Sequence, residues 1–485
     1  MELKKIFERI KILEVHGVMD NVEIHDVTAD SRKINDNTLF VAVKGTKADG
    51  HAFIGDVVKK GVKAVVCEEF PQDFSQNVCY IKVEDSHDGL GKIASAFYGY
   101  PSEKLSLVGV TGTNGKTTTA TLLYQLFRAA GFKSGLLSTV ENYVETEVFP
   151  TSNTTPDPLT INSLLSKMVE KGCSYCFMEV SSHSVVQKRI SGLKFKLAIF
   201  SNITLDHLDY HKTFQEYIKA KKMFFDNLDE EAFALTNGDD KNGKVMVQNT
   251  KAQVKTYGLK GFYDFNASIL ECGFEGMLLN ICGKEMWSFL PGVFNAYNLL
   301  AVYSSAVLLG LTQDEVLTKL SALHSVKGRF DIVNINKITA IVDYAHTPDA
   351  LENVLNTINN IRKDLCSPTT LITVCGCGGD RDKSKRPLMA QIACKLSDKV
   401  ILTSDNPRTE NPDSILDDMF AGLKSEDLRK SVRITDRKSA IQTASMMAKP
   451  GDIILIAGKG HENYQEINGV KHHFDDKEIV TAALS

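Results

Sequence analysis

Short apolar runs alternate with longer amphipathic stretches along most of the 485-residue chain. In the N-terminal part, apolar runs at Thr38–Val43 and Ala64–Cys67 flank a helical pattern at Ile54–Lys60. Short runs rich in β-branched residues predict buried strands, and apolar positions three and four residues apart predict helices. We therefore expect a small α/β module at the start of the chain.

Beyond residue 104 the alternation becomes regular. The predicted strands are Leu105–Val110, Tyr175–Val180 and Leu197–Phe200, and the predicted helices are Leu122–Ala130 and Thr213–Leu228. The pattern restarts after Gly328-Arg329, with predicted strands at Ile338–Asp343, Thr370–Val374, Lys399–Thr403 and Asp452–Ala457. Such alternation is typical of parallel sheets covered by helices on both faces.

The predicted fold class is α/β with three domains. A length of 485 residues suits three domains of roughly 150 residues each. We place a small α/β domain at residues 1–102, a central P-loop ATPase-like domain with a parallel sheet at 103–328, and a C-terminal Rossmann-like domain at 329–485. The polar turn Tyr100–Lys104 marks the first boundary, and Gly328-Arg329 marks the second.

Composition narrows the functional class. With 56 Lys and Arg against 60 Asp and Glu, the net charge is only −4, which argues against general affinity for nucleic acid. The chain has no apolar leader and no run of about 18 apolar residues. We therefore expect a cytoplasmic protein that does not insert into membranes, and we expect a monomer.

The strongest local motif is a glycine-rich loop that follows a predicted strand and opens a predicted helix. Glycines let backbone amides approach phosphates, Lys116 can neutralise the β- and γ-phosphates of ATP, and Thr117 can offer its hydroxyl to Mg²⁺. The helix N-terminus adds a favourable dipole. We expect the following residues to bind ATP: Gly112, Thr113, Asn114, Gly115, Lys116, Thr117 and Thr118.

Two later segments carry residue types that bind metal ions. Glu179 stands at the carboxyl tip of the strand Tyr175–Val180, where open α/β sheets place their ligands. The segment 202–211 follows another strand and contains two aspartates and two histidines, of which His207 is the candidate ligand. Lys221 lies in the predicted helix Thr213–Leu228, where a lysine is ordinarily a solvated surface residue.

The glycine-rich loop is shorter than the general P-loop, because Val110 stands five positions before Gly115, where that pattern has glycine. In this form it resembles the loop of the Mur ligase superfamily, which folylpolyglutamate synthetases share. The resemblance implies ATP-dependent amide formation through an acyl phosphate, with Mg²⁺ as cofactor. It also implies that CO₂ carbamylates Lys221, with Lys222 as the adjacent alternative. The implied catalytic residues are Lys116, Glu179, His207 and Lys221, and the implied metal ligands are Thr117, Glu179, His207 and the carbamate of Lys221.

The same resemblance extends to the nucleotide-linked substrate. The segment Asp30-Ser31-Arg32 is similar to the uridine-diphosphate-binding domain of Mur ligases, in which the serine contacts the uracil or diphosphate. Asn37 departs from the glycine common there, although asparagine also tolerates a positive φ. The positions that resemble a UDP-muropeptide site are Ser31, Thr154, Thr155, Ser181, Gln187 and Arg189.

The C-terminal domain carries the residues that would select the amino acid. The segment Asp405-Asn406-Pro407-Arg408 resembles that of Mur ligases that take meso-2,6-diaminopimelate, although taken alone it would be a plain turn. Arg408 can bind the second carboxylate of diaminopimelate bidentately, and lysine would leave that arginine unpaired. The implied diaminopimelate contacts are Arg381, Asp405, Asn406, Arg408, Gly458 and Glu462.

Three more residues complete the implied ATP site: Asn295 near the adenine, Arg329 at the boundary of the last domain, and Asp343 near the ribose. The resemblance thus implies ligation of meso-diaminopimelate to a UDP-linked muropeptide, with closure of the last domain around a hinge near Arg329. The alternatives are a lysine-adding Mur ligase, a folylpolyglutamate synthetase-like ligase, and a P-loop module that binds nucleotide without ligation.

Overall fold

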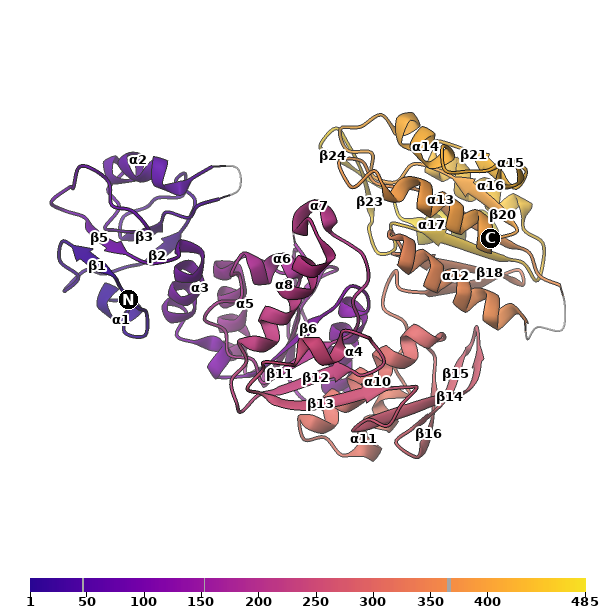
Figure 1. The fold of residues 1–485 in the computed structure, drawn as a ribbon, viewed down its shortest axis with the longest axis horizontal. Helices are drawn as coiled ribbons and strands as arrows, with labels where there is room; N and C mark the ends of the chain where they lie inside the picture. The colour runs from indigo at the N-terminus through magenta and orange to yellow at the C-terminus, as the bar shows by residue number, and fades with distance from the viewer. Residues whose placement is uncertain (46–47, 152, 364–367) are drawn as a thin grey trace.

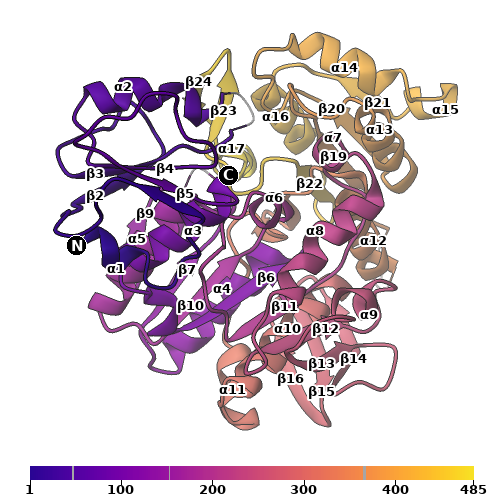
Figure 2. The same cartoon turned by 60° about the vertical axis from the view of Figure 1, so that its left-hand side comes forward.

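The computed structural model describes residues 1–45, 48–151, 153–363 and 368–485. Three α/β parts follow one another along the chain, and Figures 1 and 2 both show the N-terminal and C-terminal parts at the upper left and upper right of the central part. Within the described residues, no helix combines the length and apolar character needed to cross a membrane.

The N-terminal part is a sheet with the strand order β1-β5-β4-β3-β2, in which only the β1–β5 pairing is antiparallel. All four residues of β4 are buried, and this strand has the predicted bounds. Helix α3 packs on α5 of the central part. The elements are α1 (Leu3–Ile6), β1 (Glu14–His16), β2 (Asp26–Thr28), β3 (Thr38–Val41), η1 (Gly50–Phe53), α2 (Ile54–Lys59), β4 (Ala64–Cys67), β5 (Cys79–Lys82), α3 (Ser86–Phe97) and η2 (Pro101–Glu103).

The central sheet has the order β16-β15-β14-β13-β12-β11-β6-β10-β7-β8-β9. Its middle strands, from β14 to β7, pair in parallel as predicted, whereas antiparallel strands that the sequence analysis did not identify extend both edges. Helices cover both faces: α4, α10 and α11 pack on one, and α5 and α8 on the other.

The bounds in the central part are β6 (Ser106–Thr111), α4 (Lys116–Ala129), β7 (Ser134–Leu137), β8 (Asn142–Val144), β9 (Glu147–Phe149), α5 (Pro158–Glu170), β10 (Tyr175–Glu179), α6 (Ser182–Val186), β11 (Leu197–Phe200), α7 (Leu208–His211), α8 (Phe214–Asp226), β12 (Phe233–Asn237), α9 (Gly243–Met246), β13 (Gln253–Gly258), β14 (Phe265–Gly273), β15 (Gly276–Ile281), β16 (Lys284–Ser288), α10 (Val293–Leu308) and α11 (Gln313–Leu320).

Helices α8 and α4 both reach the site. Thr213 caps α8, because its hydroxyl accepts a hydrogen bond of 3.2 Å from the backbone N–H of Glu216. Helix α4 begins at Lys116, six residues before the predicted Leu122. Its first turns contain buried threonines, so the apolar pattern that predicts a helix appears only later in the sequence.

The C-terminal sheet has the order β17-β18-β22-β19-β20-β21, and only the β17–β18 pairing is antiparallel. Helices α12, α13 and α14 pack on one face, and α16 and α17 pack on the other. The elements are β17 (Asp331–Ile335), β18 (Ile338–Asp343), α12 (Pro348–Lys363), β19 (Leu371–Cys375), α13 (Lys385–Leu396), β20 (Lys399–Leu402), α14 (Pro412–Phe420), α15 (Ser425–Leu428), β21 (Ser431–Arg433), α16 (Arg437–Met447), β22 (Ile453–Ala457), β23 (Tyr464–Ile467), β24 (Val470–His473) and α17 (Asp476–Leu484).

Candidate active site

A cavity of about 900 Å³ lies between the central and C-terminal parts. The carboxyl ends of parallel strands from both sheets open into it, which is where open α/β sheets bind ligands. Most of the predicted site residues line this cavity, and Gly112, Ser31 and Gln187 lie outside its lining. The predicted residues in the lining are Thr113, Asn114, Gly115, Lys116, Thr117, Thr118, Thr154, Thr155, Glu179, Ser181, Arg189, His207, Lys221, Asn295, Arg329, Asp343, Arg381, Asp405, Asn406, Arg408, Gly458 and Glu462.

The glycine-rich loop connects β6 directly to α4. Gly115 has a φ of 87°, and a Cβ atom there would lie 2.4 Å from Oδ1 of Asn298, so the position requires glycine. Lys116 folds back over the loop, since its Nζ donates to the backbone oxygens of Gly112 and Thr113, each at 2.8 Å. Side chains after β11 hold the loop from outside as well, since Ser201 donates to the backbone oxygen of Asn114 at 2.6 Å and Asn202 accepts from the N–H of Asn114 at 2.9 Å.

Glu179 lies beside this loop at the end of β10, next to β6, and its side chain is fully buried. Its Oε2 accepts a hydrogen bond of 3.0 Å from the hydroxyl of Thr117, and its Oε1 accepts one of 2.7 Å from the N–H of Thr139. Among the described residues, no Lys, Arg or His approaches this carboxylate within 4.0 Å. A buried carboxylate next to a hydroxyl and without an ion pair within that distance suits Mg²⁺, which takes one or two protein oxygens and keeps sites for water and phosphate.

In the part of the chain that the structure describes, no three His, Cys, Asp or Glu side chains gather closely enough to hold a metal ion by themselves. The predicted set contains only two residues of these types, Glu179 and His207. Phosphate oxygens, water, the Thr117 hydroxyl and any group added to Lys221 would have to supply the remaining ligands.

Lys221 projects from α8 to the underside of the loop and is only 1% exposed. Its Nζ donates a hydrogen bond of 2.8 Å to the backbone oxygen of Gly112. Burial, and after it the charge of Lys116, lowers the pKa of Lys221 well below the ordinary lysine value. Lys222, the alternative position, pairs instead with Asp226 at 2.5 Å, one turn along the same helix. Lys221 is thus the lysine that faces the cavity.

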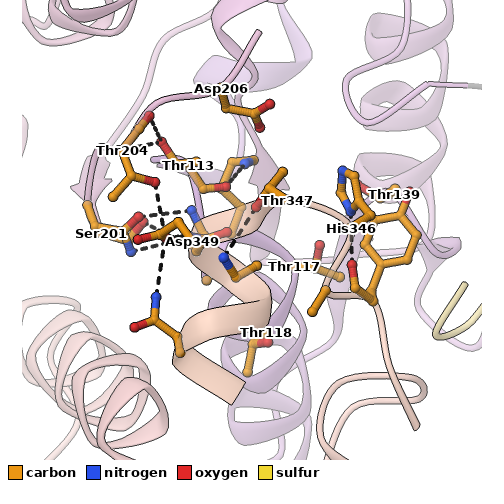
Figure 3. A pocket seen from close by; sticks show the side chains of 18 of the residues that line it. Thr113, Thr117, Thr118, Thr139, Ser201, Thr204, Asp206, His346, Thr347 and Asp349 are labelled. Atoms are coloured by element: carbon orange, nitrogen blue, oxygen red, sulfur yellow. Dashed lines mark hydrogen bonds between the residues drawn. The ribbon is translucent and has the colours of Figure 1, made fainter. Parts of the chain in front are cut away.

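His207 lies in the loop after β11 and has a positive φ of 54°. Partial desolvation by the cavity wall lowers the pKa of His207 to about 4, although its side chain is still 44% exposed and the adjacent carboxylate of Asp206 opposes the shift. The imidazole is therefore neutral near pH 7 and can offer a lone pair to a metal ion. Asp206 also lines the cavity, as Figure 3 shows, and the sequence analysis did not single it out.

The predicted muropeptide residues form a hydrogen-bonded group behind Glu179. The hydroxyl of Thr155 donates to the backbone oxygen of Glu179 at 2.8 Å and accepts from the N–H of Ser181 at 3.0 Å. Arg189 donates to the backbone oxygen of Thr155 at 2.7 Å and to Oε1 of Gln187 at 2.6 Å. Gln187 therefore orients Arg189 from outside the cavity.

Thr154 and Ser31 occupy different environments. The Thr154 hydroxyl accepts a hydrogen bond of 3.1 Å from Thr139 and lines the cavity. Ser31 belongs to the N-terminal part, where its backbone oxygen accepts a hydrogen bond of 2.7 Å from Lys60. Asn37, six residues after Ser31, has a φ of 62°, which is the positive φ that asparagine tolerates.

Four predicted amino-acid contacts form a connected group at the C-terminal sheet. Asn406 donates from Nδ2 to Oε2 of Glu462 at 2.8 Å, and its Oδ1 accepts from the buried Lys459 at 3.0 Å. Gly458 has a φ of 120°, and a Cβ there would lie 2.7 Å from Oδ2 of Asp405. The glycine therefore lets the two loops approach each other.

The two predicted arginines lie on adjacent loops. Arg408 has a φ of 51°, donates from Nη1 to the backbone oxygen of Gly379 at 2.6 Å, and lies 3.6 Å from the carboxylate of Glu466. Arg381 is exposed at the rim of the cavity. Two guanidinium groups on one rim suit a ligand that carries a carboxylate.

The remaining predicted ATP residues come from both sides of the cavity. Arg329 donates to the hydroxyl of Thr117 at 3.1 Å and lies over the ring of Tyr344 at 4.4 Å. Asp343 accepts from the N–H of Phe330 at 2.6 Å, and burial raises its pKa. Asn295 accepts from Nδ2 of Asn298 at 3.2 Å.

Asp349, in the first turn of α12, is a cavity residue that the sequence analysis missed. Its Oδ2 accepts hydrogen bonds from Nδ2 of Asn114 at 2.8 Å and from the hydroxyl of Thr204 at 3.1 Å, and thus joins the C-terminal part to the phosphate loop (Figure 3). An acidic residue in a first helical turn is ordinary in any sequence, because it complements the helix dipole. Its role becomes visible only when the two parts are placed together.

Comparison with known families and proteins places this cavity in context. Three family models match in succession: the Mur ligase family catalytic domain at residues 23–98, the Mur ligase middle domain at 110–306, and the Mur ligase glutamate ligase domain at 328–460. Together they match the segments that supply both walls of the cavity.

Curated relatives match nearly the whole chain. A protein of Phocaeicola vulgatus, named UDP-N-acetylmuramoyl-L-alanyl-D-glutamate--2,6-diaminopimelate ligase, is 59% identical over 481 residues, which cover 99% of each chain. A Chlorobaculum tepidum protein of the same name is 42% identical and covers 95% of this chain and 92% of its own.

Solved structures show the same fold. One of a UDP-N-acetylmuramoyl-L-alanyl-D-glutamate--2,6-diaminopimelate ligase aligns with a TM-score of 0.70 at 32% identity, covering 100% of this chain and 98% of that one. A folylpolyglutamate synthase of Mycobacterium tuberculosis, complexed with ADP and AMPPCP, aligns with a TM-score of 0.62 at 16% identity, covering 77% of this chain and 93% of its own. The latter likeness concerns the fold alone. With all three family models matched in order and relatives this similar over the full length, the chain belongs to the Mur ligase family.

Proposed function

We propose that this protein ligates meso-2,6-diaminopimelate to UDP-N-acetylmuramoyl-L-alanyl-D-glutamate at the expense of ATP, in peptidoglycan synthesis. The observation that carries the proposal is that the phosphate loop and the residues predicted to bind the diamino acid line one cavity. The names of relatives up to 59% identical support the same substrate.

The reaction has two steps. The γ-carboxylate of the D-glutamyl residue attacks the γ-phosphorus of ATP, which forms an acyl phosphate and releases ADP. The amine of diaminopimelate then attacks the acyl carbon. The bond between this carbon and the phosphate oxygen breaks, phosphate leaves with the electron pair, and the nitrogen loses a proton. Lys116 and the loop amides stabilise the charge of the transferring phosphoryl group, and Arg329 lies close enough to Thr117 to contribute.

Mg²⁺ would be held by Thr117, Glu179, His207 and a carbamate on Lys221, and would neutralise charge on the phosphates. Carbamylation joins the Lys221 nitrogen to the carbon of CO₂ and releases one proton. A buried lysine with a strongly lowered pKa is suited to this reaction, because the neutral amine is the nucleophile. The product replaces a buried neutral amine with an anionic oxygen ligand.

In the same proposal, Ser31, Thr154, Thr155, Ser181, Gln187 and Arg189 serve the UDP-muropeptide, and Arg381, Asp405, Asn406, Arg408, Gly458 and Glu462 serve the diamino acid. The domain bounds 1–102, 103–328 and 329–485, the cytoplasmic location and the monomeric state stay predictions. Use of ATP and of a nucleotide-linked substrate favours the cytoplasm as its location.

The test is phosphate release by the wild-type protein, with ATP, Mg²⁺ and the UDP-linked dipeptide, on addition of each candidate amino acid. We expect release with meso-diaminopimelate and little with L-lysine. Release with L-lysine alone would assign the lysine-adding alternative, and release with L-glutamate and a folate, but not with the UDP-linked dipeptide, would assign a folylpolyglutamate synthetase. ATP binding without any release would leave only a nucleotide-binding module.

A further inference from the structure

The amino-acid end of the cavity is the part lined by Arg381, Asn406 and Arg408. Arg386 is a fully buried arginine beneath it and is absent from the cavity lining. It lies at the start of α13. Its Nη1 donates to Oε2 of Glu410 at 3.0 Å and to Asp418 of α14 at 2.8 Å, and its Nη2 donates to Oε1 of Glu410 at 2.8 Å. The guanidinium therefore holds Glu410 with both ends of its fork.

Glu410 connects two loops through this contact. Its Oε1 also accepts a hydrogen bond of 2.6 Å from the N–H of Asp380, the residue before Arg381. The carboxylate of Asp380 in turn accepts hydrogen bonds from the N–H of Thr409 at 3.2 Å and from its hydroxyl at 2.8 Å. The loop after β19 and the loop after β20 are thus fastened to each other by the two residues that follow Arg408.

The two loops also touch directly. A Cβ atom at Gly379 would lie 2.0 Å from the backbone oxygen of Pro407, so the backbones are in close contact there. Arg408 donates to the backbone oxygen of Gly379 at 2.6 Å. Any change in the distance between the loops would therefore move Arg408 relative to Arg381.

We propose that Arg386 is a positioning residue for substrate selection: through Glu410 it fixes the spacing between Arg381 and Arg408, and so the preference for an amino acid with a second carboxylate. This inference rests on the proposed function. Because Arg386 is fully buried and outside the lining, its effect reaches the substrate only through the two loops.

The planar fork of arginine is essential to this arrangement. A lysine at the same place could keep the charge, but it offers a single ammonium group and cannot hold both oxygens of Glu410 while reaching Asp418. Binding sites for a carboxylate lose affinity when their donors move by a fraction of an ångström to one ångström. Arg386→Lys should therefore impair recognition of the distal carboxylate more than it impairs phosphoryl transfer.

A matched control exists in the same part of the molecule. Arg433 pairs with Asp417 at 2.6 Å and with Asp413 at 3.1 Å, both on α14, the helix that carries Asp418. This arginine is partly exposed, and its contacts do not involve the loops that carry Arg381 and Arg408. Arg433→Met thus removes two ion pairs to α14 and leaves the contacts between Arg386, Glu410 and the two loops unchanged.

The experiment compares wild-type protein with Arg386→Lys, Glu410→Gln and Arg433→Met, after circular dichroism has shown which variants are folded. KM for meso-diaminopimelate, ATP and the UDP-linked dipeptide is measured with kcat at saturation. We expect Arg386→Lys to raise KM for diaminopimelate about tenfold or more, with kcat and the other two KM values within about twofold. Glu410→Gln should show the same selective change at smaller size, and Arg433→Met should show none.

A folded Arg386→Lys with an unchanged KM for diaminopimelate would overturn the inference, as would a uniform rise of all three KM values. If Arg386→Lys does not fold, Glu410→Gln decides in the same way. The proposed function is tested separately by the wild-type protein, because release with L-lysine and not with diaminopimelate would refute the substrate before any variant is made.

Discussion

The cavity has a phosphate end, formed by the glycine-rich loop at residues 112–118, and an amino-acid end. Each lies at the carboxyl ends of the parallel strands of one sheet, yet the two ends are constructed differently. At the phosphate end, a single loop between β6 and α4 supplies most of the groups. At the amino-acid end, residues come from separate loops after β19, β20 and β22. The phosphate loop is one continuous segment, held by Lys116 and by side chains such as Lys221 that pack against it. The amino-acid site is distributed and depends on whatever holds its separate loops together.

Buried cations hold the loops at the amino-acid end. Arg386 joins two of them through Glu410, and Lys459 fixes the amide of Asn406 by donating to its Oδ1 at 3.0 Å. Arg437 donates to the backbone oxygens of Ser404 and Ala457 at 3.5 and 3.1 Å and pairs with the buried Asp476. Mutations at the phosphate end should therefore lower kcat, whereas mutations at the amino-acid end should reduce the selectivity for the amino acid.

The largest effect is expected at the phosphate end. Lys116→Met should lower kcat by about 10³-fold with any amino acid, because no other loop side chain brings a positive charge to the transferring phosphoryl group. Single-turnover phosphate release measures this loss, with thermal unfolding as the control for folding. A fall in kcat with diaminopimelate but not with other amino acids would show that the phosphate end also selects the amino acid, which would contradict this division.

Lys221→Ala should lower kcat by about 10²-fold, because it removes the predicted carbamate from the metal site. Lys219→Ala, an exposed lysine on the same helix, is the matched control and should retain the wild-type rate. If CO₂ modifies Lys221, wild-type activity should also fall in buffer freed of CO₂ and return on addition of bicarbonate. A rate indifferent to bicarbonate in the depleted enzyme would count against carbamylation.

Asp349 joins the two ends, and its loss should have an intermediate effect. Asp349→Ala removes the acceptor for Asn114 and Thr204, and two hydrogen bonds of about 1 kcal/mol each correspond to a rise in KM for ATP of roughly thirtyfold. KM for diaminopimelate should change much less. Equal changes in both KM values would indicate that Asp349 sets the whole domain arrangement and does not act on the phosphate loop alone.

The smallest effect concerns pH. Hydrogen bonds from Arg386 are the main cause that lowers the pKa of Glu410 to about 2. Because this folded value lies below the unfolded value of about 4.3, the contribution to stability is complete above roughly pH 5 and is lost as the pH falls toward 2. The difference in urea midpoint between wild type and Glu410→Gln should therefore shrink as the pH is lowered over that range. A difference that grows instead would mean that Glu410 is not the charged partner.

The two ends also differ in how far the sequence predicts them. The strand-loop-helix pattern at 105–130 identified the phosphate loop from elementary chemistry, and Ala64–Cys67, Leu197–Phe200 and Ile338–Asp343 have their predicted bounds. The antiparallel strands β8, β9, β15 and β16 escaped prediction, because β8 and β9 have only three residues each and polar residues interrupt the apolar runs of β15 and β16.

At the amino-acid end, the residues were found only through a family resemblance. Asp405-Asn406-Pro407-Arg408 looks like a turn, and nothing in its spacing indicates that Arg381 and Glu462 lie beside it. Arg386 and Lys459 were missed for a related reason: an arginine or lysine in a sequence is ordinarily a surface residue, and only the fold shows that these two are fully buried.

The most direct test of the central claim uses Arg408→Ala with both diamino acids. For wild-type protein we predict a kcat/KM for meso-diaminopimelate at least about 10²-fold above that for L-lysine, because lysine has no second carboxylate to accept hydrogen bonds from Arg408. In Arg408→Ala the value for diaminopimelate should fall by about that factor, whereas the value for L-lysine and the KM for ATP should stay within about threefold. An equal loss with both amino acids, or no loss with diaminopimelate, would contradict the account.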